Sequence, residues 1–147
     1  MKEELLEELK IAMREKDELR KDTITGLRAA ILQVEKDTQK KLTKKDMEII
    51  VAKEVKKRKE SFSDYEKANR QDIIENLKRE IEILSKYLPK QLTIEEIELI
   101  VRASIEKLGA TTPKQMGLVM RDINEKIAGK ADGKQVSEMV KKLLGEN

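Results

Sequence analysis

Residues 87–96 read Tyr-Leu-Pro-Lys-Gln-Leu-Thr-Ile-Glu-Glu, and this stretch determines how the chain is organised. Pro89 disfavours helical backbone angles at the residue before it, so a helix is expected to end there. Thr93 and Glu96 have the spacing of a capping box, in which each side chain satisfies a free N–H group at the start of a helix. The stretch therefore predicts the end of one helical unit and the beginning of another.

On its N-terminal side, apolar residues recur every three or four positions, which is typical of helices packed on one face. The four stripes are Leu5, Leu9, Ala12 and Met13; Ile24, Leu27, Ile31 and Val34; Met47, Ile50, Val51, Val55, Phe62 and Tyr65; and Ile73, Leu77, Ile81, Leu84 and Leu88. Thr43 and Asp46 predict the cap of the third helix, and Asn69 to Asp72 predict a break before the fourth. We expect an N-terminal domain of about four helices in residues 1–90.

On the C-terminal side, three further stripes predict a small three-helix domain in residues 92–147. They are Ile97, Ile100, Val101, Ile105 and Leu108; Met116, Val119, Met120, Ile123 and Ile127; and Val136, Met139, Val140 and Leu143. Gly109 is expected to close the first of these helices. Thr112 and Pro113 are expected to start the second, and Asp132 to cap the third. The predicted fold class is all-α.

The composition argues against most kinds of catalysis. The chain has no histidine and no cysteine, so the commonest general base and the usual zinc ligands are missing, and we expect no metal and no cofactor. Glu95, Glu96 and Glu98 cluster, but acids in a first helical turn ordinarily complement the helix dipole. Ser61, Ser63 and Ser104 have no base nearby in the sequence. We therefore expect a binding protein, cytoplasmic and without a membrane span, whose assignment as an enzyme stays open but disfavoured.

Two basic stretches are candidates for binding. The first, residues 36–59, has ten basic residues against four acidic ones, and its candidate side chains are Lys53, Lys56, Lys57, Arg58 and Lys59. It is either a footprint for phosphates or a solvated helix face. The second surrounds the link 129–133, where Lys130 and Lys134 flank the start of the last helix and Arg121 and Lys114 precede it. Free N–H groups at a helix start favour an anion, although Asp132 could cap those groups instead.

The scarcity of aromatic residues narrows the class of ligand. Phe62, Tyr65 and Tyr87 are the only aromatic side chains in the sequence, and single-stranded nucleic acid is usually held by bases stacked on such rings. Folded RNA, which is recognised through shape and backbone, is the better expectation, and no DNA partner is predicted. A protein partner is the alternative, with faces around Leu118 and Leu144 free to receive a helix.

Several segments in this order resemble the GatB/YqeY family. They are Tyr87-Leu-Pro-Lys-Gln-Leu92, Met116-Gly-x-Val-Met120 and Gly129-Lys-Ala-Asp-Gly133, with Arg58-Lys-Glu-Ser61 and Ala68-Asn-Arg70 in the middle of the chain. The resemblance implies that residues 92–147 are similar to the tail domain of GatB, a component of the bacterial glutamyl/aspartyl-tRNA amidotransferase. In that carbon-nitrogen ligase, which uses glutamine as amide donor, the tail contacts the body of the tRNA.

For this chain, the resemblance implies a non-catalytic accessory protein that binds tRNA, because the catalytic parts of that enzyme lie in other domains. The alternative is a protein–protein adaptor. The enzyme's tail commonly reads Gly-Lys-Ala-Asn-Pro, whereas this chain has Asp132-Gly133 at the last two positions. The aspartate adds a negative charge where the resemblance places a phosphate.

Overall fold

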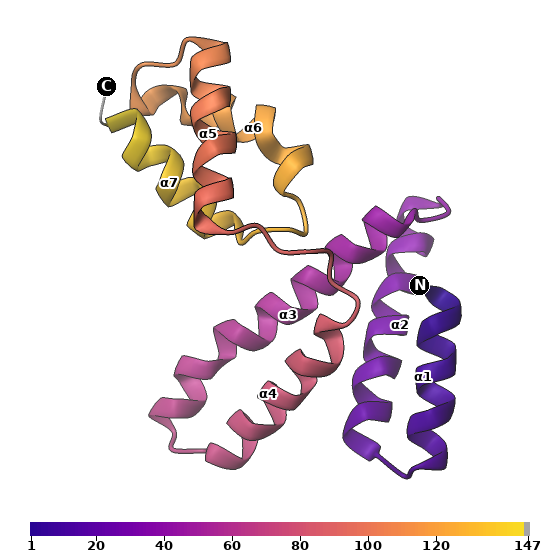
Figure 1. The fold of residues 1–147 in the computed structure, drawn as a ribbon. Coiled ribbons are helices and arrows are strands. Elements are labelled where there is room, and N and C mark those ends of the chain that lie inside the picture. Colours follow the sequence, from indigo (N-terminus) through magenta and orange to yellow (C-terminus); the bar gives the residue numbers. More distant parts are fainter. Residues whose placement is uncertain (146–147) are drawn as a thin grey trace. The chain divides into compact units, whose positions relative to one another are not determined.

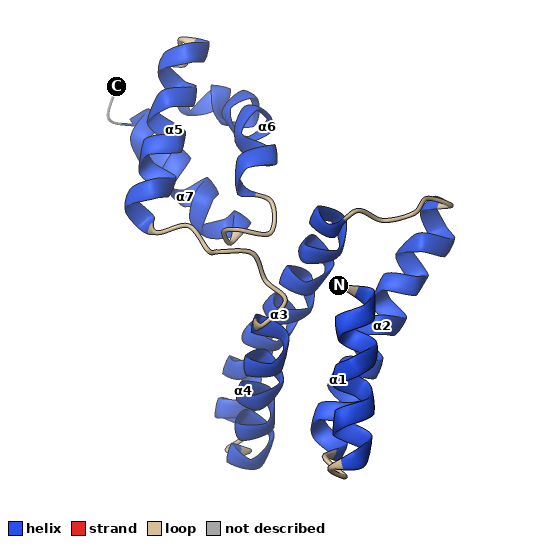
Figure 2. Cartoon of the chain, turned by 45° about the vertical axis from the view of Figure 1, so that its right-hand side comes forward, coloured by secondary structure: helices blue, strands red, loops and turns tan. Residues whose placement is uncertain are grey.

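The computed structural model describes residues 1–145 and consists of helices joined by short links (Figures 1 and 2). The helices are α1 (Lys2–Arg14), α2 (Glu18–Thr38), α3 (Lys44–Lys67), α4 (Gln71–Ser85), α5 (Ile94–Leu108), the 3₁₀ turn η1 (Pro113–Gln115), α6 (Met116–Ile127) and α7 (Gly133–Gly145). None of the described residues forms a strand. The predicted all-α class is confirmed.

Contacts divide the chain into two units, Met1–Leu88 with α1 to α4 and Pro89–Asn147 with α5 to α7. Each unit has its own apolar core. The division falls at Pro89, which lies within the stretch that the sequence marks as the boundary. That each unit folds as an independent domain stays a prediction.

In the first unit, α1 pairs with α2, α3 pairs with α4, and α2 packs against both α3 and α4 (Figure 1). The core that these helices enclose consists of Leu5, Ile24, Leu27, Ile31, Met47, Ile50, Val51, Val55, Leu84 and Tyr87. Most of these residues belong to the predicted stripes. Met13 is an exception, because 58% of its surface is exposed at the end of α1. Ile74 is buried on α4, where the pattern placed Ile73.

A charged network joins three parts of this unit. Glu8 on α1 contacts Arg20 on α2, and Lys86, just after α4, lies 3.3 Å from the same carboxylate. The hydrogen bond from Arg20, followed by that from Lys86, holds the pKa of Glu8 below its usual value. Next to it, Tyr87 is buried, and the loss of hydration raises its pKa to about 12. The network and the tyrosine tie the end of α4 to the α1–α2 pair.

The helix ends follow local side-chain chemistry. Thr43 and Asp46 form the predicted capping box, with bonds of 3.1 Å and 2.9 Å between each side chain and the other residue's N–H. Asn69 takes a left-handed conformation between α3 and α4, where the sequence predicts a break. At α5, the predicted capping box is only half formed. The Thr93 hydroxyl accepts from the Glu96 N–H at 3.1 Å, while the Glu96 carboxylate accepts from that hydroxyl and not from the backbone.

In the second unit, α6 contacts both α5 and α7 around a core without aromatic residues. Gly109 ends α5 in the left-handed conformation, as predicted. Ser104 is buried on α5 and donates a 2.6 Å hydrogen bond to Asp122 on α6. The predicted start of the next helix at Pro113 is displaced, because Gln115 accepts from the N–H groups before Pro113 and holds a 3₁₀ turn ahead of α6.

Candidate nucleic-acid interface

The link between α6 and α7 is a tight turn. Gly129 has a φ of 76°, which an L side chain rarely adopts, and the N–H groups of Lys130 and Ala131 both donate to the Ile127 carbonyl. Ala131 also packs against the core of the unit. The backbone that carries Lys130 is therefore held in place by its own hydrogen bonds and by the core beneath it.

The segment after Pro89 fixes this link from a second side. The Leu92 N–H donates to the Lys130 carbonyl at 2.8 Å, and the Gln91 side-chain amide donates to the Gly129 carbonyl at 3.0 Å. Two of the family-like segments, distant in sequence, thus lie against each other. In the sequence analysis the two segments were separate motifs. The only local signal of their contact is the polar Gln91 next to the apolar Leu92. Lys90, an exposed cation missed by the sequence analysis, immediately precedes this contact.

At the start of α7, Asp132 acts as the predicted cap. Its carboxylate accepts a 3.0 Å hydrogen bond from the Lys134 N–H, so one of the free amides that could hold an anion is already used. Gly133 is exposed, and a Cβ atom built on it would meet nothing within 4 Å. The backbone at Gly133 is therefore accessible to a ligand, but the Asp132 carboxylate lies next to it.

The four predicted tRNA-binding residues are spread along the second unit. Lys130 lies in the link and is half-buried, and Lys134 lies in the first turn of α7 and is exposed. Lys114 precedes α6, whose 12 residues separate it from the link by roughly 18 Å, and Arg121 lies between them. Within the described part of the chain, none of the four pairs with a carboxylate; Arg121 donates only to the Gly117 carbonyl. Of the four, only Lys130 and Lys134 therefore lie at the same helix start.

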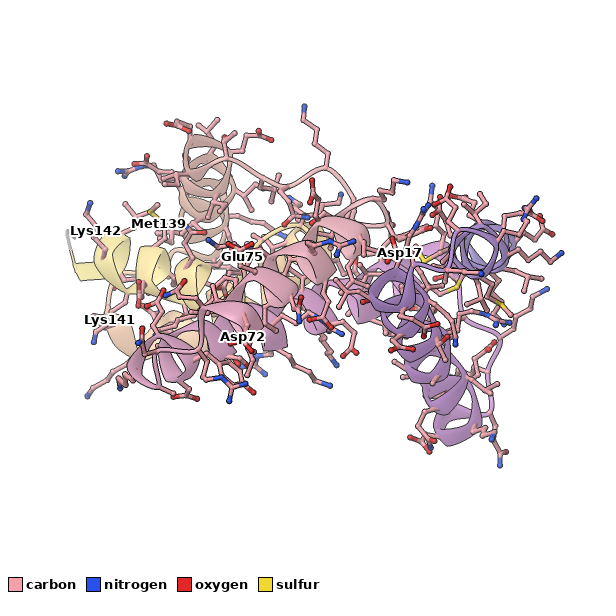
Figure 3. All side chains as sticks on the ribbon, turned by 90° about the horizontal axis from the view of Figure 1, so that it is seen from below. Asp17, Asp72, Glu75, Met139, Lys141 and Lys142 are labelled. Atoms are coloured by element: carbon pink, nitrogen blue, oxygen red, sulfur yellow. The ribbon has the colours of Figure 1, made fainter. Side chains whose placement is uncertain are left out.

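More basic charge lies at the far end of α7. Lys141 and Lys142 are exposed in its last turns, and they lie on different sides of the helix (Figure 3). Cations in this position complement the negative end of the helix dipole. Lys141 and Lys142, at the end of α7, therefore provide a matched comparison for Lys130 and Lys134 near its start.

The basic stretch on α3 does not form one patch. Lys53, Lys56, Lys57 and Lys59 are exposed, but Arg58 is turned toward α4. It lies 3.7 Å from Glu80 on α4 and 3.8 Å from Glu54, one turn earlier on α3 itself. Its side chain is only 19% exposed. Arg58 thus joins α3 to α4 within the first unit. The exposed positive charge of the five candidates comes from the lysines, of which Lys57 pairs with Glu54 at 3.1 Å.

Four of the six acids and serines that could support catalysis, Glu96, Glu98, Ser61 and Ser104, have structural partners. The Glu96 carboxylate accepts from the hydroxyl of Thr93, the residue that caps α5, and Glu98 pairs with Arg102 at 2.8 Å. Ser61 donates to the Lys57 carbonyl one turn earlier. Among the described residues, no group of three or more acids is placed to hold a metal ion, and no helix is long and apolar enough to cross a membrane.

The fold and these contacts define an all-helical protein of two units, with exposed cations at the ends of the helices in its C-terminal unit. The chain belongs to the family of YqeY-like proteins, whose model matches residues 2–144. It is also 40% identical over 78 residues to the altered inheritance of mitochondria protein 41 of Lachancea thermotolerans, a mitochondrial protein. The match covers 52% of this chain and 42% of that relative, so the chain spans less than half of the relative's length.

Proposed function

We propose that this YqeY-type protein is a non-catalytic accessory protein that binds the phosphate backbone of folded RNA, with tRNA as the first ligand to test. The observation that carries the proposal is the pair Lys130 and Lys134 on either side of the start of α7, next to a link held by hydrogen bonds from Gln91 and Leu92. Both cations lack a carboxylate partner within the described residues. Paired lysines on a rigid backbone bind phosphate without first having to order that backbone.

The kind of RNA follows from what the second unit contains. All three aromatic residues of the chain lie in the first unit, so the second has no ring on which an unpaired base could stack. Contacts to phosphates along a folded backbone remain as the mode of recognition. The choice of tRNA, and the link to a glutamine-dependent amidotransferase, rest on the resemblance of residues 92–147 to the tail of that enzyme.

The test compares the pairs of lysines at the two ends of α7. One variant combines Lys130→Ala with Lys134→Ala; the control combines Lys141→Ala with Lys142→Ala, and each removes two charges. Binding of labelled tRNA is measured from low to moderate salt. Each phosphate contact contributes about 0.9 to the slope of log affinity against log salt on a duplex, so the first variant is expected to lower the slope by roughly 2. Equal losses in both variants would show that only net charge matters.

A second variant tests the role of Asp132. Asp132→Asn removes a negative charge from the site while asparagine still caps the helix, so affinity for tRNA is expected to rise. The comparison ligand is heparin, an anionic polymer without RNA shape. If wild type and Asp132→Asn both bind tRNA no better than heparin, the proposal fails.

The adaptor remains the second candidate, because Leu99 and Leu118 are 69% and 49% exposed on the second unit. The sequence also assigned Leu144 to such a face, and this was wrong: Leu144 is completely buried in the core. The mitochondrial location belongs to the relative's name, and the cytoplasmic location expected for this chain stays a prediction.

A further inference from the structure

A groove runs between α1 and α2 in the first unit. Its volume is about 450 Å³, and its lining includes Leu5, Leu6, Thr25, Ala29 and Leu32. Leu6 is 39% exposed and Leu32 is 52% exposed, so two leucines stand at the surface beside the groove. At one end, Lys2 and Glu35 close the space between the helices with a 2.7 Å ion pair. The first unit thus has an apolar hollow that its own side chains leave open.

The exposed side of α2 next to this groove has an ordered pattern. Five exposed residues of α2 are spaced three or four positions apart, which places them on one stripe of the helix. They are Asp22, Thr25, Ala29, Leu32 and Lys36. The side chains at the centre of the stripe, Thr25 and Ala29, are small. The residues at its two ends, Asp22 and Lys36, carry opposite charges. Within the described residues, neither Asp22 nor Lys36 has an ion-pair partner.

Gly26 lies beside the centre of this stripe, inside a helix of 21 residues. A glycine there costs about 1 kcal/mol relative to alanine. Nothing within the chain requires it, because an added Cβ would meet no atom within 4 Å. Small side chains at a helix surface allow a second helix to approach to the short end of the usual 8–10 Å between axes. The stripe therefore has the shape of a helix-packing surface.

We propose that this surface binds a second copy of the same chain, with the two α2 helices antiparallel about a twofold axis at Ala29. Asp22 and Lys36 each lie seven residues from Ala29, because 29 − 22 and 36 − 29 are both 7. Under twofold symmetry, Asp22 of each copy then meets Lys36 of the other, twice. Leu32 of each copy reaches the level of Gly26 on the other, because 32 − 29 and 29 − 26 are both 3.

This arrangement selects a second copy over an unrelated helix because the stripe is complementary to itself. The stripe begins with the acidic Asp22, has the small Ala29 at its centre and ends with the apolar Leu32 and the basic Lys36. A partner helix complements these side chains if it presents the same kinds of residue in the reverse order. An antiparallel second copy of α2 does so. The contact buries two Leu32 side chains that are half exposed in one chain. It also pairs four charges that have no ionic partner within their own unit.

Charge exchange tests the proposal on the full-length chain. Sedimentation equilibrium is expected to show a dimer for the wild type and a monomer for Asp22→Lys and for Lys36→Asp, because each single change places like charges opposite each other. An equimolar mixture of the two variants restores both opposite-charge pairs, as does the double variant, so both are expected to dimerise. A wild-type monomer at the highest attainable concentration, or a mixture that stays monomeric, overturns the proposal.

A covalent readout locates the axis. The chain has no cysteine, so Ala29→Cys introduces a single thiol where the twofold axis brings the two copies within disulfide reach. Mild oxidation is expected to convert this variant to a disulfide-linked dimer, whereas Ser63→Cys, exposed on α3, stays monomeric. If both variants cross-link at the same rate, the contact is random collision and the proposed interface is wrong. Circular dichroism of each variant confirms that it remains folded.

Discussion

Replacing Gln91 by alanine tests whether the segment after Pro89 stabilises the second unit. The change removes both hydrogen bonds of the Gln91 side-chain amide, to the Gly129 carbonyl at 3.0 Å and to the Pro89 carbonyl at 2.9 Å. It leaves the Leu92 to Lys130 backbone bond in place. An exposed hydrogen bond contributes about 0.5–1 kcal/mol net. For a unit of this size, that loss corresponds to a fall of roughly 3–8 °C in the melting temperature.

The distribution of aromatic residues allows the two units to be followed separately. Tyrosine fluorescence reports on the first unit alone, whereas far-ultraviolet circular dichroism reports on the helices of both. Gln91→Ala is expected to lower the stability seen by circular dichroism without moving the tyrosine transition. Amide exchange at Leu92 is expected to become faster.

The matched control is Gln135→Ala, which changes an exposed glutamine on α7 that makes no side-chain hydrogen bond within the described residues. It is expected to leave stability unchanged or slightly higher, since alanine favours helix. If Gln91→Ala and Gln135→Ala behave alike, the link is not held by Gln91. If Gln91→Ala shifts the tyrosine transition equally, the two units do not unfold separately.

Three further predictions concern the units and their cores. Limited trypsin treatment is expected to cut after Lys90 and leave a C-terminal fragment with helical circular dichroism; a random-coil spectrum would contradict the two-domain interpretation. The Ser104 hydroxyl, and then Lys107, hold the pKa of Asp122 below its usual 3.8, so its contribution is present above that pH and lost as pH falls through the lowered pKa. Urea unfolding against pH should therefore lose part of its acid dependence in Asp122→Asn, and an unchanged profile would exclude this role. Leu84→Ala, at a fully buried position, is expected to cost about 2–5 kcal/mol in the tyrosine transition, and a cost below about 1 kcal/mol would show that the core refills.

Features with local causes were predictable from the sequence. The caps at Thr43 and Asp132 and the left-handed Gly109 depend on residues within one turn, so their chemistry is visible in a short window. Most of the buried residues were also identified, because helical periodicity marks the face that must leave water. For the candidate site, this local reasoning correctly placed Lys130 and Lys134 beside the start of α7.

Features that depend on distant partners were not predictable. Leu144 is completely buried in the core of the second unit, whereas Met13, in the last turn of α1, is 58% exposed. Arg58 belongs to a run of basic residues in sequence, yet the approach of α4 turns it inward toward Glu80. The contact of Gln91 with Gly129 joins residues 38 positions apart, and no local pattern shows it.

The position of Tyr87 has a consequence for synthesis. Leu84 and Tyr87 are among the last residues of the first unit, and both are buried in its core. Because a chain leaves the ribosome from its N-terminus, α1 to α3 emerge before the residues that complete this core are available. A nascent chain halted before Leu84 would present the apolar faces of α2 and α3 to water. Premature termination in α4 is thus expected to yield an aggregating product, whereas termination after Leu88 yields a unit with a closed core.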